Sequence, residues 1–171
     1  LNKLNQTYKV LFDKINKLQD EITIYTHAWE GGNIDHDTSF VICLKLFREI
    51  PKIKLAYQFP FYNSYKMPIN FFRVFYPISE NGAAEKLHLS FNEKIKFIKY
   101  LFTYSSQLKI WFGLYPFIIF KILINKYNFL QKIEKNFFLR KPHKNLLWYE
   151  KQNFADFEKT LMKFELFLNN N

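Results

Sequence analysis

The chain has 171 residues, of which 49% are hydrophobic and 23% are charged. This length predicts one domain, and this composition excludes wholesale disorder. The formal net charge of +10 favours either an anionic partner or a lysine-rich surface. Because the 25 basic residues are spread along the chain without a long uninterrupted run, we favour the lysine-rich surface and expect no nucleic-acid partner.

The single cysteine, Cys43, excludes an internal disulfide framework and any cysteine-rich zinc site. It lies within the apolar run Phe40–Leu44, which predicts a buried structural thiol. No signal peptide is recognisable, and the apolar run at 110–120 is shorter than the roughly 20 residues of a bilayer span. We therefore expect a cytoplasmic protein, with association with a membrane surface as the lesser alternative.

The first third of the chain predicts alternating helices and strands. A helix is indicated by apolar residues spaced along one face, namely Leu4, Tyr8, Leu11, Ile15 and Leu18. A short strand follows at 21–25, and then a helix at 37–49 with Asp35 or Asp37 as its N-cap. Pro51 ends this helix, and 53–59 reads as a buried strand. The order strand, helix, strand predicts a βαβ unit.

The rest of the chain is less regular. Residues 63–84 predict a long loop with a strand at 71–76, and Ser90-Phe91-Asn92-Glu93 matches a capping box that opens a helix over 91–107. Apolar residues 110–138 favour helix over strand. A late strand is expected at 146–149, followed by a closing amphipathic helix from Phe154 to Leu168.

A cluster of polar side chains follows the first strand. It surrounds the pair Gly31-Gly32 and comprises His27, Glu30, Asp35, His36 and Asp37. Such a loop at the carboxyl end of a strand is the usual place for chemistry in α/β proteins. Imidazole and carboxylate groups also suit a borderline metal such as zinc. A structural or helix-capping role for the same residues is the alternative.

This segment resembles the PIG-L/LmbE family of metal-dependent N-acetylglucosaminyl deacetylases. The family pattern is approximately His-x-x-Glu-Gly-Gly-His-Pro-Asp-His-Asp, and the chain reads His27-Ala28-Trp29-Glu30-Gly31-Gly32-Asn33-Ile34-Asp35-His36-Asp37. Residues 55–63, 87–107 and 138–150 are similar to later segments of the family. The resemblance thus covers most of the chain, in order.

The resemblance implies an α/β fold of the Rossmann-like, three-layer type and a zinc-dependent hydrolase that removes the N-acetyl group from an N-acetylglucosamine-containing glycan or glycoconjugate. It places the metal ligand at His36 and the catalytic positions at Asn33 and Asp35. The glycines let the backbone turn tightly beneath the site. The resemblance assigns a surrounding or substrate-binding role to the remaining residues: His27, Glu30, Gly31, Gly32, Asp37 and Arg140.

The chain departs from the family pattern in two ways. Asn33 replaces a histidine, and an amide cannot donate a proton to a leaving amine, a loss worth about 10²- to 10⁴-fold in rate. The motif Ala-His-Pro-Asp-Asp-Glu, which supplies the family's other two ligands and its general base, is absent. We therefore expect residues 1–171 to be the C-terminal part of such a domain, N-terminally incomplete and inactive alone. The alternative is a decayed, non-catalytic sugar-binding or interaction protein of the same fold.

Several single residues carry two interpretations each. His27 is either a ligand or a structural histidine, and Trp29 either stacks on a sugar or packs beneath the loop. His143 is expected in a solvated basic turn and His88 on the surface. Arg140 is expected either in a salt bridge or in contact with an anionic group.

Overall fold

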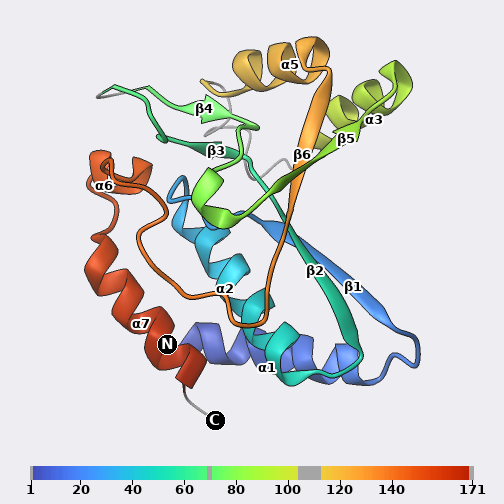
Figure 1. Cartoon of the computed structure of the whole chain (residues 1–171), viewed down its shortest axis with the longest axis vertical. Coiled ribbons are helices and arrows are strands. Elements are labelled where there is room, and N and C mark those ends of the chain that lie inside the picture. The colour runs from blue at the N-terminus through green and yellow to red at the C-terminus, as the bar shows by residue number, and fades with distance from the viewer. Residues whose placement is uncertain (1, 69–70, 104–112, 170–171) are drawn as a thin grey trace.

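The computed structural model describes residues 2–68, 71–103 and 113–169. Within them, a four-stranded sheet has the order β1-β2-β6-β5, and a separate pair joins β3 to β4 (Figure 1). The strands are β1 (Ile22–His27), β2 (Ile53–Phe59), β3 (Tyr62–Asn63), β4 (Arg73–Val74), β5 (Ala84–His88) and β6 (Tyr127–Lys132). The protein is therefore a mixed α/β fold with an open, mixed sheet.

The helices fall into two groups in Figure 1. Three lie beside the parallel end of the sheet, α1 (Asn2–Asn16), α2 (Ile34–Glu49) and α7 (Phe157–Asn169). Two lie together at the far end of β5 and β6, α3 (Phe91–Leu101) and α5 (Tyr115–Ile124). A short 3₁₀ turn (Ser79–Asn81) and the short helix α6 (Trp148–Lys151) complete the described structure.

The predicted βαβ unit is confirmed. Strands β1 and β2 are parallel, with His27 opposite Phe59 at their carboxyl ends, and α2 connects them. Strand β6 then pairs antiparallel with both β2 and β5. The sheet thus has one parallel pair followed by antiparallel strands. Among the described strands, β1 forms one edge and β5 the other.

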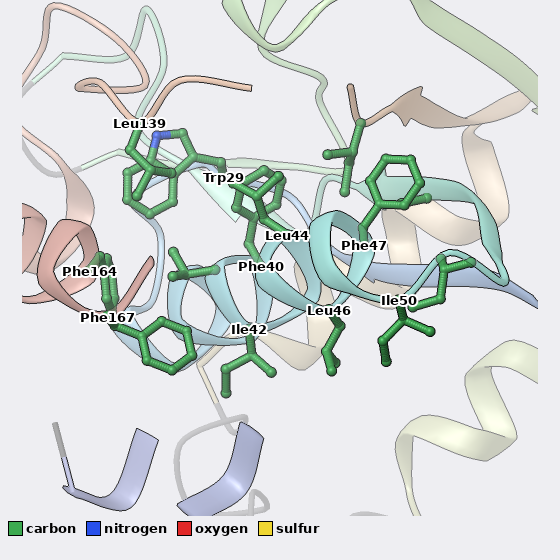
Figure 2. Close-up of a cluster of buried hydrophobic side chains, with 14 of the residues drawn as sticks. Trp29, Phe40, Ile42, Leu44, Leu46, Phe47, Ile50, Leu139, Phe164 and Phe167 are labelled. Atoms are coloured by element: carbon green, nitrogen blue, oxygen red, sulfur yellow. The ribbon is translucent and has the colours of Figure 1, made fainter. Parts of the chain in front are cut away.

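Helix α2 is the centre of the main hydrophobic core. Figure 2 shows side chains that leave this helix in several directions, toward α7 on one side and Leu139 and Trp29 on another. From Phe40 to Phe47 every residue of α2 is buried, because β1, β2, α1 and α7 surround it. Cys43 lies in this stretch, as predicted, and burial raises the pKa of its thiol to about 12. An inert structural thiol follows from this environment.

Three sequence predictions for secondary structure were wrong or incomplete. Strand β2 is only half buried, since its outward face leaves Leu55 37% exposed while Ala56 is in the core. Residues 127–132 form β6, where helix was favoured, because two neighbouring strands satisfy their backbone groups. No strand forms at 146–149. The helix α6 begins at Trp148, and Glu150 caps its start by accepting a hydrogen bond from the Leu147 amide (2.8 Å).

Helix α3 begins as predicted and ends earlier. Ser90 and Glu93 form the reciprocal capping box at its start. The helix ends at Leu101, and the remainder of the expected helix beyond residue 103 lies outside the described residues, as do 110–112. None of the helices within the described ranges combines the length and the hydrophobicity that a bilayer crossing requires.

Candidate functional site

The segment that follows β1 turns back into the core before it reaches α2. The Trp29 side chain is fully buried, and its indole nitrogen donates to the Arg140 carbonyl oxygen (2.7 Å). The Trp29 amide donates to the Gln58 side chain on β2 (3.0 Å). Trp29 therefore packs beneath the loop, which leaves no exposed ring to stack on a sugar.

The two glycines permit this turn, as the sequence suggested. Gly31 has φ +65°, a left-handed conformation that favours glycine. At Gly32 a Cβ atom would lie 1.8 Å from the Tyr62 carbonyl oxygen, so no larger residue fits without a backbone shift. The close approach brings the strand β3 segment against the loop.

Glu30 links the loop to that segment. Its carboxylate is fully buried and accepts hydrogen bonds from the amides of Phe61 (2.9 Å) and Tyr62 (3.1 Å) and from the side-chain nitrogen of Asn63 (3.0 Å). Burial raises the pKa of Glu30 to about 8, against the lowering effect of these donors. The carboxylate is thus engaged by backbone and side-chain donors, and it positions the loop at 61–63.

Asp37 performs a similar task from the first turn of α2. One oxygen of its buried carboxylate accepts from the amides of Glu30 and Gly31, both at 3.2 Å. Burial raises the pKa of Asp37 to about 7, partly offset by these two amides. Asp37 thus contacts the loop backbone and the Tyr149 side chain, and it connects the loop after β1 to α2.

The N-cap of α2 is Asn33, which corrects the expectation of Asp35 or Asp37. The Asn33 side-chain oxygen accepts from the Asp35 amide (2.8 Å), while the two aspartates lie in the first turn. An amide satisfies this position because it accepts from the free N–H groups of the first turn. Asp35 itself is exposed.

His36 and His27 form a stacked pair. Their ring centroids lie 3.9 Å apart with an interplanar angle of 8°, and the His36 Nδ1 atom is 4.0 Å from a Glu30 oxygen. Burial, and then the neighbouring His27, lowers the pKa of His36 to about 3, and burial also lowers the pKa of His27. Both rings are therefore neutral at neutral pH, and each keeps a lone pair able to accept a proton or bind a metal.

The histidine pair lines a cavity of about 800 Å³. Its polar lining comes from β1 and the start of α2 on one hand, and from α3 and β6 on the other: His27, Asn33, Asp35, His36, Ser39, Glu93, Lys96 and Asn128. Most of the remaining lining is apolar or aromatic and comes from β2 and the residues after it, α3, β5, β6 and Leu114, which precedes α5: Phe59, Pro60, Phe61, Tyr62, Phe75, Leu87, Leu89, Phe97, Tyr100, Leu101, Phe129 and Leu130. The cavity thus meets the sheet where β1 and β2 have their carboxyl ends.

Some predicted site residues lie apart from this cavity. Glu30, Asp37 and the two glycines lie behind it, where they hold the loop. The Arg140 guanidinium donates to the Glu80 carbonyl oxygen (3.5 Å), a backbone contact in place of the expected salt bridge. His143 is 3% exposed beside Tyr65, so the prediction of a solvated turn was wrong, because the residues around it close over the ring.

The aromatic residues that line the cavity were not predicted from the sequence. Phe61 and Tyr62 contact the His36 ring, with centroids at 5.4 and 5.5 Å. These residues come shortly after β2. Because the predicted strands β1 and β2 are parallel, the segments after both strands are expected at the same end of the sheet, which is where His36 lies. Residues of α3 and β6 have no such indication, since they are far away in the sequence.

The residues present do not fit a complete catalytic zinc site. Within the described ranges, no group of three or more His, Cys, Asp or Glu side chains could hold a metal ion. A catalytic zinc normally has three protein ligands. Hydrogen-bond donors occupy Glu30 and Asp37. That leaves the two neutral histidines, of which the motif resemblance selects His36 as the ligand.

Comparison with known proteins returned no match: no family model fits the sequence, and neither a curated protein nor a solved structure matches it.

Proposed function

We propose that this chain is the C-terminal part of a Rossmann-like domain of the PIG-L/LmbE type, which removes the N-acetyl group from an N-acetylglucosamine-containing glycan or glycoconjugate. The observation that carries the proposal is that Asn33, Asp35 and His36 together line a cavity. These are the residues to which the motif resemblance gives chemical roles. Alone, the chain is expected to be inactive.

The cavity is consistent with a sugar-sized ligand. Ligand pockets typically have volumes of about 300–1,000 Å³ and combine apolar walls with a few polar groups. Here His36 supplies a neutral imidazole, and the Asn33 amide nitrogen can donate a hydrogen bond to a carbonyl oxygen. Among the aromatic residues of the lining, Tyr100 is 62% exposed and offers a face on which a pyranose ring can stack.

A non-catalytic sugar-binding or interaction protein of the same fold is the second candidate. The observation that favours it is the structural use of Asn33, whose side-chain oxygen caps α2. An amide in this place can bind a substrate carbonyl and cannot act as an acid. A protein with these residues alone would bind the acetamido group without cleaving it.

Zinc titration with acetate release tests the main proposal. The chain is incubated with N-acetylglucosaminides and zinc, and acetate and bound metal are measured. We expect weak zinc binding and no turnover, because one histidine provides one ligand. Tight stoichiometric zinc or measurable acetate release from this chain would contradict it.

Binding is tested separately by NMR. We expect methyl N-acetylglucosaminide to shift the imidazole resonances of His27 and His36 and to leave those of His88, which is exposed on β5, unchanged. His36→Gln should weaken this binding, and His88→Gln is the matched control. Shifts that are equal at all histidines would contradict binding at the cavity and both candidate functions with it.

A further inference from the structure

Helix α5 is apolar on the side that faces away from the protein. Ile118 and Ile122 are buried against the body of the molecule. On the opposite side Phe117 is 59% exposed and Phe120 is 63% exposed, with Leu123 and Ile124 beside them. Phe117, Phe120 and Ile124 have the i, i+3, i+7 spacing of a single helical face, and Leu123 lies next to it.

This distribution is unusual for a helix at a protein surface. Such helices normally carry charged or polar residues on their outer face, and a helix that is hydrophobic all round is usually covered. The outer face of α5 is rimmed by lysines in place of a polar stripe, since Lys121 lies within the helix and Lys126 just beyond it. A surface of this kind is complementary to a partner with an apolar interior and a negatively charged surface.

The charge of the surrounding sequence has the same sign throughout. Residues 94–133 contain no aspartate and no glutamate. They contain seven lysines and therefore carry +7 of the chain's formal net charge of +10: Lys94, Lys96, Lys99, Lys109, Lys121, Lys126 and Lys132. A second copy of the chain would present the same positive charge, so electrostatics opposes self-association through this face.

Helix α3 contacts α5 near both ends of α5. The Lys94 ammonium donates to the carbonyl oxygens of Leu123 (3.2 Å) and Asn125 (2.7 Å), at the carboxyl end of α5. At the other end, the Phe102 ring stacks on Tyr115 (4.9 Å, 7°). The two helices lie side by side in Figure 1. Tyr100 and Phe102, at the carboxyl end of α3, are exposed aromatic residues next to α5.

We propose that the exposed face of α5, with the adjoining end of α3, docks on the surface of an anionic lipid bilayer. The four exposed apolar side chains of α5 would enter the interfacial region, and Lys121 and Lys126 would lie among the lipid phosphates. With ten residues, α5 is about 15 Å long, which suits a helix lying in the interface and is half the thickness of the hydrocarbon core.

Docking of this kind has a consequence for the cavity. Residues of α3, such as Phe97 and Tyr100, line it, so a bilayer that contacts α3 and α5 would lie next to the cavity. The proposal does not depend on the deacetylase assignment, because the four exposed side chains of α5 that carry it do not line the cavity.

Vesicle cosedimentation with the full chain tests the proposal. Vesicles of phosphatidylcholine alone are compared with vesicles that also contain phosphatidylglycerol. We expect binding to the anionic vesicles, and a strong loss when salt is raised from about 0.1 M to about 1 M, where the screening length falls from about 10 Å to about 3 Å. Absence of binding to anionic vesicles at low salt would overturn the proposal.

A pair of double variants distinguishes binding through this face from non-specific hydrophobic binding. Phe117→Ser with Phe120→Ser should weaken binding at least about tenfold. Its matched control is Phe138→Ser with Phe154→Ser, which removes two rings that lie elsewhere and are more exposed, at 74% and 79%. Equal losses in both variants would overturn the proposal.

Charge reversal provides a second comparison. Lys121→Glu with Lys126→Glu should weaken binding about tenfold or more, whereas Lys3→Glu with Lys9→Glu on α1, with the same change in net charge, should have a smaller effect. Light scattering checks for the competing occupant. If the wild-type chain is a dimer that the α5 phenylalanine variant converts to a monomer, the face binds a second copy, and the proposal is wrong.

Discussion

Helices α2 and α5 have similar apolar sequences and opposite surroundings. In α2 every residue from Phe40 to Phe47 is buried, even Lys45. In α5, which contains no acidic residue, only Tyr115, Ile118 and Ile122 are buried. The reason lies in the number of neighbours, since α2 has β1, β2, α1 and α7 around it while α5 packs mainly on α3 and β4.

This difference shows that an apolar helix sequence favours burial of its side chains but does not specify which partner buries them. For α2 the cover comes from the chain itself, in the core of Figure 2. For α5 the described residues cover one side, and the other side is the basis of the bilayer proposal. The predictions below test the contrast, in order of decreasing effect on stability.

The largest effect is expected from shortening a ring in each helix. Phe40→Ala removes a side chain that is 0% exposed and should lower the free energy of unfolding by about 3–5 kcal/mol. Phe120→Ala removes an exposed ring and should change it by no more than about 0.5 kcal/mol. Urea unfolding measures both. A comparable loss in the two variants would mean that α5 is covered in solution.

The next effect concerns the loop that leads into α2. Gly32→Ala places a Cβ atom against the Tyr62 carbonyl oxygen and should cost about 2–3 kcal/mol, because the backbone must shift. Gly113→Ala, just before α5, meets nothing within 4 Å and should be close to neutral. Thermal unfolding of the pair decides the matter, and a neutral Gly32→Ala would show that the loop is less constrained than described.

A pH-dependent effect is expected from His143, in the segment that leads from β6 across the α2 core. Burial, and then the nearby Lys141, lowers the pKa of His143 to about 4 from its usual 6.5. On acidification the unfolded chain takes up this proton first, so stability present above pH 6.5 is lost as the pH falls toward 4.

Between about pH 7 and about pH 5 this loss amounts to about 2 kcal/mol. His143→Gln should therefore have a free energy of unfolding that falls less over this interval than that of the wild type. His88→Gln, on the exposed strand β5, is the control. Parallel pH profiles for wild type and His143→Gln would contradict the assignment.

The smallest effect is expected at the start of α2. Asn33→Ala removes the N-cap and should cost about 1 kcal/mol, whereas Asn33→Asp keeps an acceptor for the Asp35 amide and should cost less. Urea unfolding at neutral pH compares them. Equal losses for the two variants would show that the amide of Asn33 contributes through contacts other than the cap.

Local patterns predicted the elements whose cause is local. The periodicity of α1 and α7, the Ser90 capping box, the βαβ order and the tight turn at the glycines all depend on residues within a few positions of one another. Strand β6 was missed because its partners, β2 and β5, are far away in the sequence.

The candidate site divides in the same way. The sequence by itself determined that His27, Glu30, His36 and Asp37 lie together after β1, because the glycines and the start of α2 hold them within eleven residues. Only the tertiary structure decided which of them face a cavity. Glu30 and Asp37 turned inward because backbone amides from Phe61, Tyr62 and the loop itself compensate their burial, and the histidine pair was left against aromatic walls supplied by distant strands and helices.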